Sequence, residues 1–179
     1  MRAVWRYGAA LLGAAVVLAA LAGGLGTLLG LRLNLTESLP RGIYRTISEE
    51  PGRGSIVVVC VPPEAAELAL ERGYLGPGSC PGGVRGVGKV VLAVGGDVVA
   101  HRREAISVNR TPIPDSGTLT RDSRGRAIPH HTWGDYLLEP GQLWLFSPYR
   151  PNSYDSRYFG PVNASGVVSV LRPAWTWKP

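Results

Sequence analysis

An uncharged segment near the N-terminus constrains this chain most. Between Arg6 and Arg32 lie 25 residues, 7–31, that carry no charged side chain and are rich in Ala, Leu, Val and Gly. At about 1.5 Å per residue, a helix of this length spans about 37 Å, which exceeds the roughly 30 Å hydrocarbon core of a bilayer. We therefore expect a single N-terminal transmembrane helix. The alternative is a cleaved signal peptide, whose apolar core normally has only about 7–15 residues.

This segment divides the chain into three parts. Arg2 and Arg6 favour a cytoplasmic position for residues 1–6, because cytoplasmic flanks tend to be positively charged, although Arg32 on the far side weakens the contrast. Residues 32–179 would then lie outside the cytoplasm. Their number, about 148, is the usual size of one domain with a sizeable core.

Residues 32–179 alternate short apolar runs with Gly and Pro clusters. This pattern predicts a mainly β domain, with antiparallel strands and one short helix. The helix is expected at Pro63–Glu71, where Pro62 and Pro63 mark its start and Gly73 its end. Residues 110–131 are polar and are predicted to form an extended loop or an inserted hairpin. The predicted strands are 55–61, 87–94, 97–101, 142–146 and 167–171.

Cys60 and Cys80 both lie on the expected extracytoplasmic side. An oxidising compartment favours a disulfide between them, and two free thiols are the alternative. A metal site is not expected, because the chain has no close Cys-Cys or Cys-His spacing.

The chain is basic, with a net charge of +6. Its arginines are dispersed and form no stripe with interleaved aromatic residues, so direct nucleic-acid binding is not expected. Attraction to anionic lipid or to an acidic partner accounts for the same charge, as does a simply soluble basic surface.

Ser38 is a candidate nucleophile six residues beyond Arg32. A serine becomes a nucleophile only when another group takes its proton, and His101, His130 and His131 lie in no recognisable triad segment. Lys89 lies within an apolar run, where burial would lower its pKa and leave a neutral amine that can act as general base. The alternative places Lys89 on the exposed edge of its strand.

Three blocks occur in the order seen in bacterial type I signal peptidases: Ser38 with Pro40, the Lys89 strand ending in Gly96-Asp97, and residues 153–160. The pattern of Asn34, Thr36, Ser38, Pro40, Gly42 and Tyr44 at alternate positions looks most like the TraF-type conjugative-transfer peptidases, a branch of that superfamily. Two departures from ordinary signal peptidases are Val90 in place of an arginine after the lysine, and Arg150-Pro151-Asn152 in place of Gly-Asp-Asn. The second departure favours the conjugative branch.

The resemblance implies a signal-peptidase-like β domain in which Ser38 attacks the scissile carbonyl and Lys89 is the general base. Thr36 and the Ser38 backbone N–H would form the oxyanion hole. For Asp155 a catalytic role and a structural role both stay open. Structural support is implied for Ser153, Ser156 and Arg157, and no cofactor is expected.

The implied function is that of a serine endopeptidase with a Ser/Lys dyad, anchored in the bacterial inner membrane with its catalytic domain in the periplasm. Its expected substrate is a membrane-embedded pilin precursor, whose ends such an enzyme can join into a cyclic pilin, and other conjugative transfer proteins are expected partners. The alternatives are a general signal peptidase that removes leader peptides and a non-catalytic pilus assembly subunit.

Overall fold

In the computed structural model of the chain, residues 23–26 and 28–177 are described. Most of the predicted transmembrane segment 7–31 therefore lies outside the described residues. Within them, helical structure ends at Leu28, a turn follows, and Leu31 already begins a strand. No helix among the described residues is long and apolar enough to cross a membrane.

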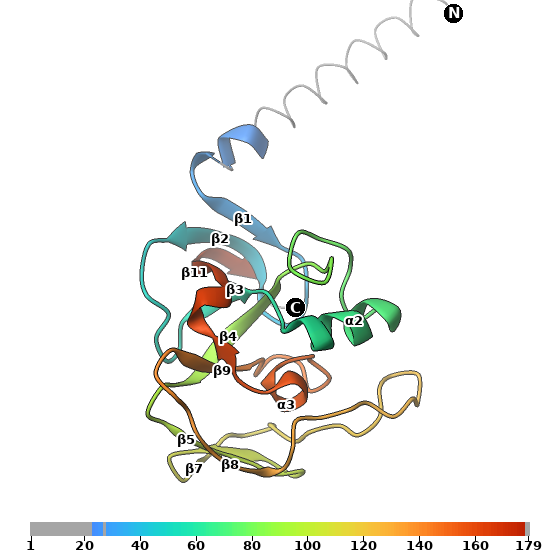
Figure 1. Ribbon diagram of the computed structural model, residues 1–179. Helices are drawn as coiled ribbons and strands as arrows, with labels where there is room; N and C mark the ends of the chain where they lie inside the picture. Colours follow the sequence, from blue (N-terminus) through green and yellow to red (C-terminus); the bar gives the residue numbers. More distant parts are fainter. Residues whose placement is uncertain (1–22, 27, 178–179) are drawn as a thin grey trace, which may run out of the picture.

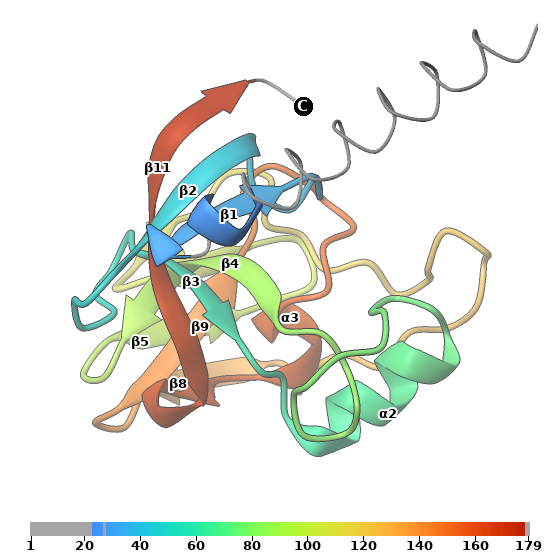
Figure 2. The same ribbon diagram turned by 90° about the horizontal axis from the view of Figure 1, so that it is seen from above.

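The described strands form two sheets, of which the larger has seven strands in the order β1-β2-β11-β3-β4-β9-β10. All its neighbouring strands run antiparallel, as the sequence predicted. The last strand of the chain is inserted between β2 and β3, and Figures 1 and 2 show it running alongside β2. The bounds are β1 Leu31–Asn34, β2 Arg41–Ile47, β3 Ile56–Val59, β4 Val87–Val94, β9 Gln142–Phe146, β10 Val162–Asn163 and β11 Val167–Trp177.

The second sheet has four described strands in the order β7-β6-β5-β8, and lies at the lower end of the molecule in Figure 1. A core that includes Val99, Ile106 and Trp144 joins it to the larger sheet. Residues 110–131 are largely loop, with a two-residue strand at their start and one isolated bridge between Arg121 and Ala127. The bounds are β5 Val98–His101, β6 Ile106–Val108, β7 Thr111–Pro112 and β8 Gly134–Leu137.

Helix α2 spans Pro63–Glu71, the predicted range, with a proline at its first position. That proline is favourable there because its fixed φ suits a helix start and its missing N–H would be unpaired anyway. Helix α3, Ser156–Phe159, was not predicted, and the 3₁₀ turn Ala164–Gly166 connects β10 to β11. The buried faces of β3, β4, β9 and α2 share the largest apolar core.

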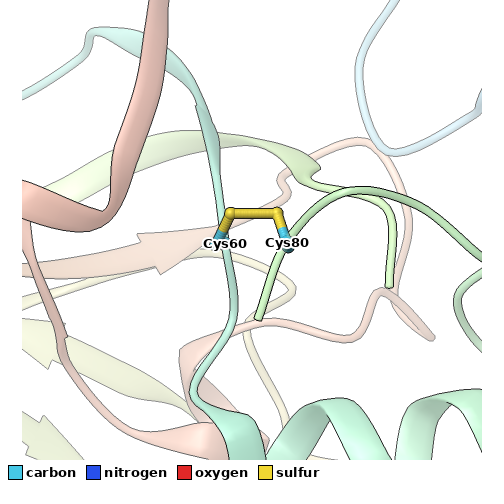
Figure 3. Close-up of a disulfide and its surroundings, with 2 residues drawn as sticks. All are labelled: Cys60 and Cys80. Carbon is cyan, nitrogen blue, oxygen red and sulfur yellow. A yellow bond between two sulfur atoms is a disulfide. The ribbon is translucent and has the colours of Figure 1, made fainter. Parts of the chain in front are cut away.

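A disulfide joins Cys60, directly after β3, to Cys80 in the loop between α2 and β4 (Figure 3). It closes a loop with a sequence separation of 20 residues. A loop of this size corresponds to about 3 kcal/mol of stabilisation in the chain-entropy account of disulfides. The disulfide therefore holds the α2–β4 loop against the larger sheet.

Candidate active site

Ser38 and Lys89 line the same cleft, which has a volume of about 850 Å³. Its walls include the turn between β1 and β2, the beginning of β4, parts of the disulfide-held loop within residues 74–86, and residues 150–154 after β9. The sequence predicted that Ser38 and Lys89 act together, and the fold brings both to one cavity although 51 positions separate them.

The side chain of Asn34 organises the turn that carries Ser38. Its Nδ2 donates hydrogen bonds to the carbonyl oxygens of Thr36, Leu39 and Pro40 at 3.0, 3.2 and 3.1 Å. Its Oδ1 accepts from the backbone N–H of Thr36 at 3.2 Å and from the Thr36 hydroxyl at 2.6 Å. Only a side chain with a donor and an acceptor can satisfy both sets of groups, which accounts for an amide at this position.

The two residues next to the candidate pair are in close contact. Leu39 follows Ser38, is 2% exposed, and packs in a core cluster with Tyr44 and Leu171. Gly88 precedes Lys89, and a Cβ added there would lie 2.8 Å from Leu39 Cδ1. The absence of a side chain at Gly88 thus allows the Ser38 turn to lie directly against the start of β4.

Lys89 occupies an inward-facing position of β4, whose residues alternate between buried and half-buried. It is 4% exposed and lies opposite Val57 of β3, which is 0% exposed. Burial lowers the pKa of the Lys89 ammonium to about 8, while the charge of Asp155 raises it and that of Arg157 lowers it. The structure thus supports the buried placement of Lys89 and not the exposed strand edge.

Asp155 and Arg157 form a buried ion pair behind Lys89. Both side chains are 0% exposed, and Arg157 Nε and Nη2 donate to Asp155 Oδ1 and Oδ2 at 2.8 and 2.9 Å. Asp155 also accepts from the backbone N–H groups of Arg157 and Ser147, each at 3.3 Å, the first of which caps α3. Arg157 donates further to the carbonyls of Gly117 and Ser153. This geometry holds the Asp155 carboxylate within the scaffold.

The remaining predicted support residues lie around this ion pair. Ser156 is 0% exposed, and its Oγ accepts a hydrogen bond of 2.8 Å from the backbone N–H of Leu145 in β9. Ser153 lines the cleft, and its buried Oγ has no hydrogen-bond partner among the described residues. Ser156 is thus tied to the sheet, whereas the buried Ser153 hydroxyl is not tied by a hydrogen bond to any described residue.

Thr36 lies next to the candidate nucleophile. Its Oγ1 is 3.4 Å from Ser38 Oγ and donates to Asn34 Oδ1 at 2.6 Å. Since one hydroxyl has one proton, this hydrogen must turn away from Asn34 before it can reach a substrate oxygen.

Charged side chains line the cleft, and Glu37 and Arg150 are among them. Glu37 forms ion pairs with Arg41, at 3.1 Å, and with Arg150, and all three side chains are partly exposed. Arg32 and Arg85 also line the cleft. Exposed ion pairs of this kind contribute only about 0–1 kcal/mol to the stability of the fold.

The histidines lie elsewhere. His101 is buried, its Nε2 is 3.0 Å from the Thr118 hydroxyl, and burial lowers its pKa to about 4. It packs with His130, His131 and Trp144, and none of the three histidines lines the cleft. Among the described residues, no group of three or more His, Cys, Asp and Glu side chains is placed to hold a metal ion.

Comparison with known proteins defines the class first. The profile of the family described as "Signal peptidase, peptidase S26" matches residues 4–176, so the chain belongs to that family. Two relatives then define the branch. A plasmid transfer protein TraF of Escherichia coli is 38% identical over 172 residues, covering 95% of this chain and 94% of the relative. A conjugal transfer protein TraF of Agrobacterium fabrum is 38% identical over 181 residues, covering 99% and 98%.

The resemblance to TraF-type proteins seen in the sequence motifs is therefore confirmed. A signal peptidase I from Enterococcus faecalis matches in three dimensions with a TM-score of 0.41 and 19% identity, over 70% of this chain and all of that structure.

Sequence reasoning missed several residues of the site. Ser147, which contacts the Ser38 backbone, follows a predicted strand and carries no motif of its own. Gly88 and Leu39 were parts of the matched blocks, but nothing in the sequence indicates that they touch. For Asn34, the only indication of a role in the site was its place in the pattern of alternate residues from 34 to 44.

Proposed function

We propose that this protein is a membrane-anchored serine endopeptidase in which Ser38 is the nucleophile and Lys89 the general base. The observation that carries the proposal is that Ser38 shares a cleft with a buried lysine whose pKa is lowered to about 8. At pH 7 a lysine of ordinary pKa is neutral in fewer than about one molecule in a thousand, whereas a pKa of about 8 leaves roughly a tenth of the molecules neutral.

The reaction follows from these two groups. Ser38 Oγ attacks the scissile carbonyl while its proton passes to Lys89 Nζ, which forms a tetrahedral intermediate with a negative oxygen. Collapse of the intermediate breaks the C–N bond, and the Lys89 ammonium returns the proton to the leaving amine. The acyl-enzyme is then resolved when Lys89 deprotonates a second nucleophile.

The oxyanion is assigned to the Ser38 backbone N–H and the Thr36 hydroxyl. Loss of one such donor typically costs about 10²–10³ in rate. Substrate binding must draw the Thr36 proton away from Asn34, because the Thr36 Oγ1 donates to Asn34 Oδ1 across 2.6 Å in the free enzyme.

The proposed substrate is the membrane-embedded precursor of a conjugative pilin. The support is the 38% identity to plasmid and conjugal transfer proteins and the position of Ser38, seven residues after the end of the apolar segment. If the second nucleophile is an amine of the same substrate chain, its effective concentration lets it compete with water and the product is a cyclic pilin.

The proposed location is the inner membrane, with residues 32–179 in the periplasm. Without the turn and strand residues 29–31, the uncharged run 7–28 would still be long enough as a helix, about 33 Å, to span a bilayer, and the Cys60–Cys80 disulfide is typical of an oxidising compartment. Large apolar side chains on β1 and β11 are exposed, among them Leu33 at 62% and Trp175 at 67%. They flank Ile43 of β2 on either side and so share one face.

The experiment is co-expression of the full chain with a conjugative pilin precursor, with intact mass of the pilin as the readout. We expect a shortened product with wild type and with the control Ser48→Ala, and none with Ser38→Ala or Lys89→Ala. A product lighter by one further water indicates cyclisation, and a product without that loss indicates hydrolysis. Processing that persists in Ser38→Ala would contradict the proposal and favour a non-catalytic assembly role.

A further inference from the structure

Ser147 connects the nucleophile turn to the strand next to Lys89. Its hydroxyl donates a hydrogen bond of 2.7 Å to the carbonyl oxygen of Ser38, across 109 positions of sequence. Its side chain is almost fully buried, since the residue is 1% exposed. Its backbone N–H donates to Asp155 Oδ2, so the main chain of Ser147 is itself held in place.

The order of strands shows why this contact matters. Ser147 follows Phe146, the last residue of β9, and Phe146 pairs with Val90 of β4. Ser38 lies in the turn between β1 and β2, and β11, β3 and β4 separate those strands from β9 in the sheet. The hydrogen bond therefore ties the nucleophile turn to the lysine side of the sheet without passing through the strands between them.

The contact acts on the nucleophile itself. Holding the carbonyl of Ser38 restricts its ψ angle, and so limits the directions in which the Ser38 side chain can leave the backbone. A misplacement of about 1 Å between reacting groups can cost about 10² in rate. We therefore expect loss of this hydrogen bond to lower the reaction rate of Ser38 and Lys89 by a larger factor than it lowers the stability of the fold.

We propose that Ser147 is a positioning residue that sets Ser38 relative to Lys89. The effect of Ser147 on catalysis rests on the proposed function. Whether Ser147 holds the Ser38 turn can be tested without any activity.

The test compares Ser147→Ala with Ser116→Ala in the full chain. Ser116 is a matched control because it is also 1% exposed and its hydroxyl also bridges backbone groups, Ile106 N–H and Ile113 C=O, in the smaller sheet. Hydrogen exchange of residues 35–41 should become about fivefold faster in Ser147→Ala, the factor typical of one hydrogen bond, and should not change in Ser116→Ala. Unchanged exchange in Ser147→Ala would overturn the proposal.

Kinetics of pilin processing provide the second readout. We expect kcat to fall about 10-fold to 100-fold in Ser147→Ala with KM within about twofold, and no such fall in Ser116→Ala. The pH midpoint should stay that of the wild type, because the Ser147 hydroxyl does not contact Lys89. Equal losses in both variants would mean that Ser147 only stabilises the fold. If the wild type processes no pilin, the proposed function fails, while the exchange result still decides whether Ser147 holds the turn.

Discussion

Leu39 lies against Gly88, so closely that a Cβ on Gly88 would be 2.8 Å from Leu39 Cδ1. Leu39 follows Ser38 and Gly88 precedes Lys89, so the contact lies next to both candidate catalytic groups.

Replacing Gly88 by alanine should therefore separate Ser38 from Lys89. The buried Leu39 side chain must shift to admit the new methyl group, and overpacking of this kind typically costs about 1–3 kcal/mol. We expect pilin processing by the folded variant to fall at least about tenfold, because reacting groups tolerate little displacement. The control is Gly52→Ala, where an added Cβ meets no atom within 4 Å. Equal activity of the two variants would show that the contact does not position the pair.

Activity should depend on the protonation of Lys89. The amine must be neutral to accept the Ser38 proton, and its pKa is lowered to about 8, so kcat/KM should rise with pH through a midpoint near 8. Lys89→Arg should be inactive throughout, since arginine stays protonated. The measurement is the pH profile of kcat/KM for pilin processing, which reports the pKa values of the free enzyme. A value of kcat/KM that does not change from pH 6 to 10 would argue against Lys89 as the base.

The same lysine should reduce stability at neutral pH. Below about pH 8 the folded state must bury a charged ammonium, whereas the unfolded chain holds it in water with a pKa near 10.5. The unfolded state binds more protons between these values, so the free energy of unfolding should rise with pH in that window. Lys89→Met should melt at a higher temperature than wild type at pH 7, and the difference should shrink toward pH 10.5. A lower melting temperature for Lys89→Met at pH 7 would contradict the buried placement.

The pH midpoint of activity can distinguish a structural role of Asp155 from a catalytic one. The Asp155 charge raises the pKa of Lys89 and Arg157 lowers it, so Asp155→Asn should move the midpoint below 8. It should also destabilise the fold by about 3–5 kcal/mol, because Arg157 remains buried without its partner. If the variant is folded, an activity loss at every pH with an unchanged midpoint would instead assign Asp155 a direct catalytic role.

The disulfide should affect both stability and substrate binding. Cys80, Ser79 and Arg85 line the cleft, and the Cys60–Cys80 bond holds their loop. Replacing both cysteines by serine should cost about 3 kcal/mol and raise KM more than it lowers kcat, because the loop forms a wall and not the reacting pair. Reductant added to the wild type should give the same change and should have no effect on the double variant.

The helices and strands that were predicted correctly are those whose local sequence pattern agrees with their burial and pairing in the fold. Pro63–Glu71 carries its own start and stop signals, and 87–94 and 142–146 are apolar runs that became central strands. The other predicted strands were found with shifted ends. β11 continues six residues past its predicted end at 171, through Pro173, because β2 offers it a pairing partner and a register shift near Pro173 accommodates the proline.

β1 and β2 were not predicted because nothing local requires them. Their residues mix charged, polar and apolar side chains, and they form strands through pairing with each other and with β11. For the site, motif order indicated Ser38, Lys89 and the Asp155 block. The contacts that position them, such as Ser147 with Ser38, join residues far apart in sequence and are visible only in three dimensions.

The insertion of β11 between β2 and β3 also determines when the site can form. Arg172 pairs with Arg45, so strands at opposite ends of the chain must meet before the larger sheet is continuous. Contacts of such long sequence separation form late, because loop closure costs entropy before any pairing compensates it. We therefore expect the Ser38 turn and Lys89 to come together only after the last strand has emerged, and a chain truncated before β11 to lack the proposed site.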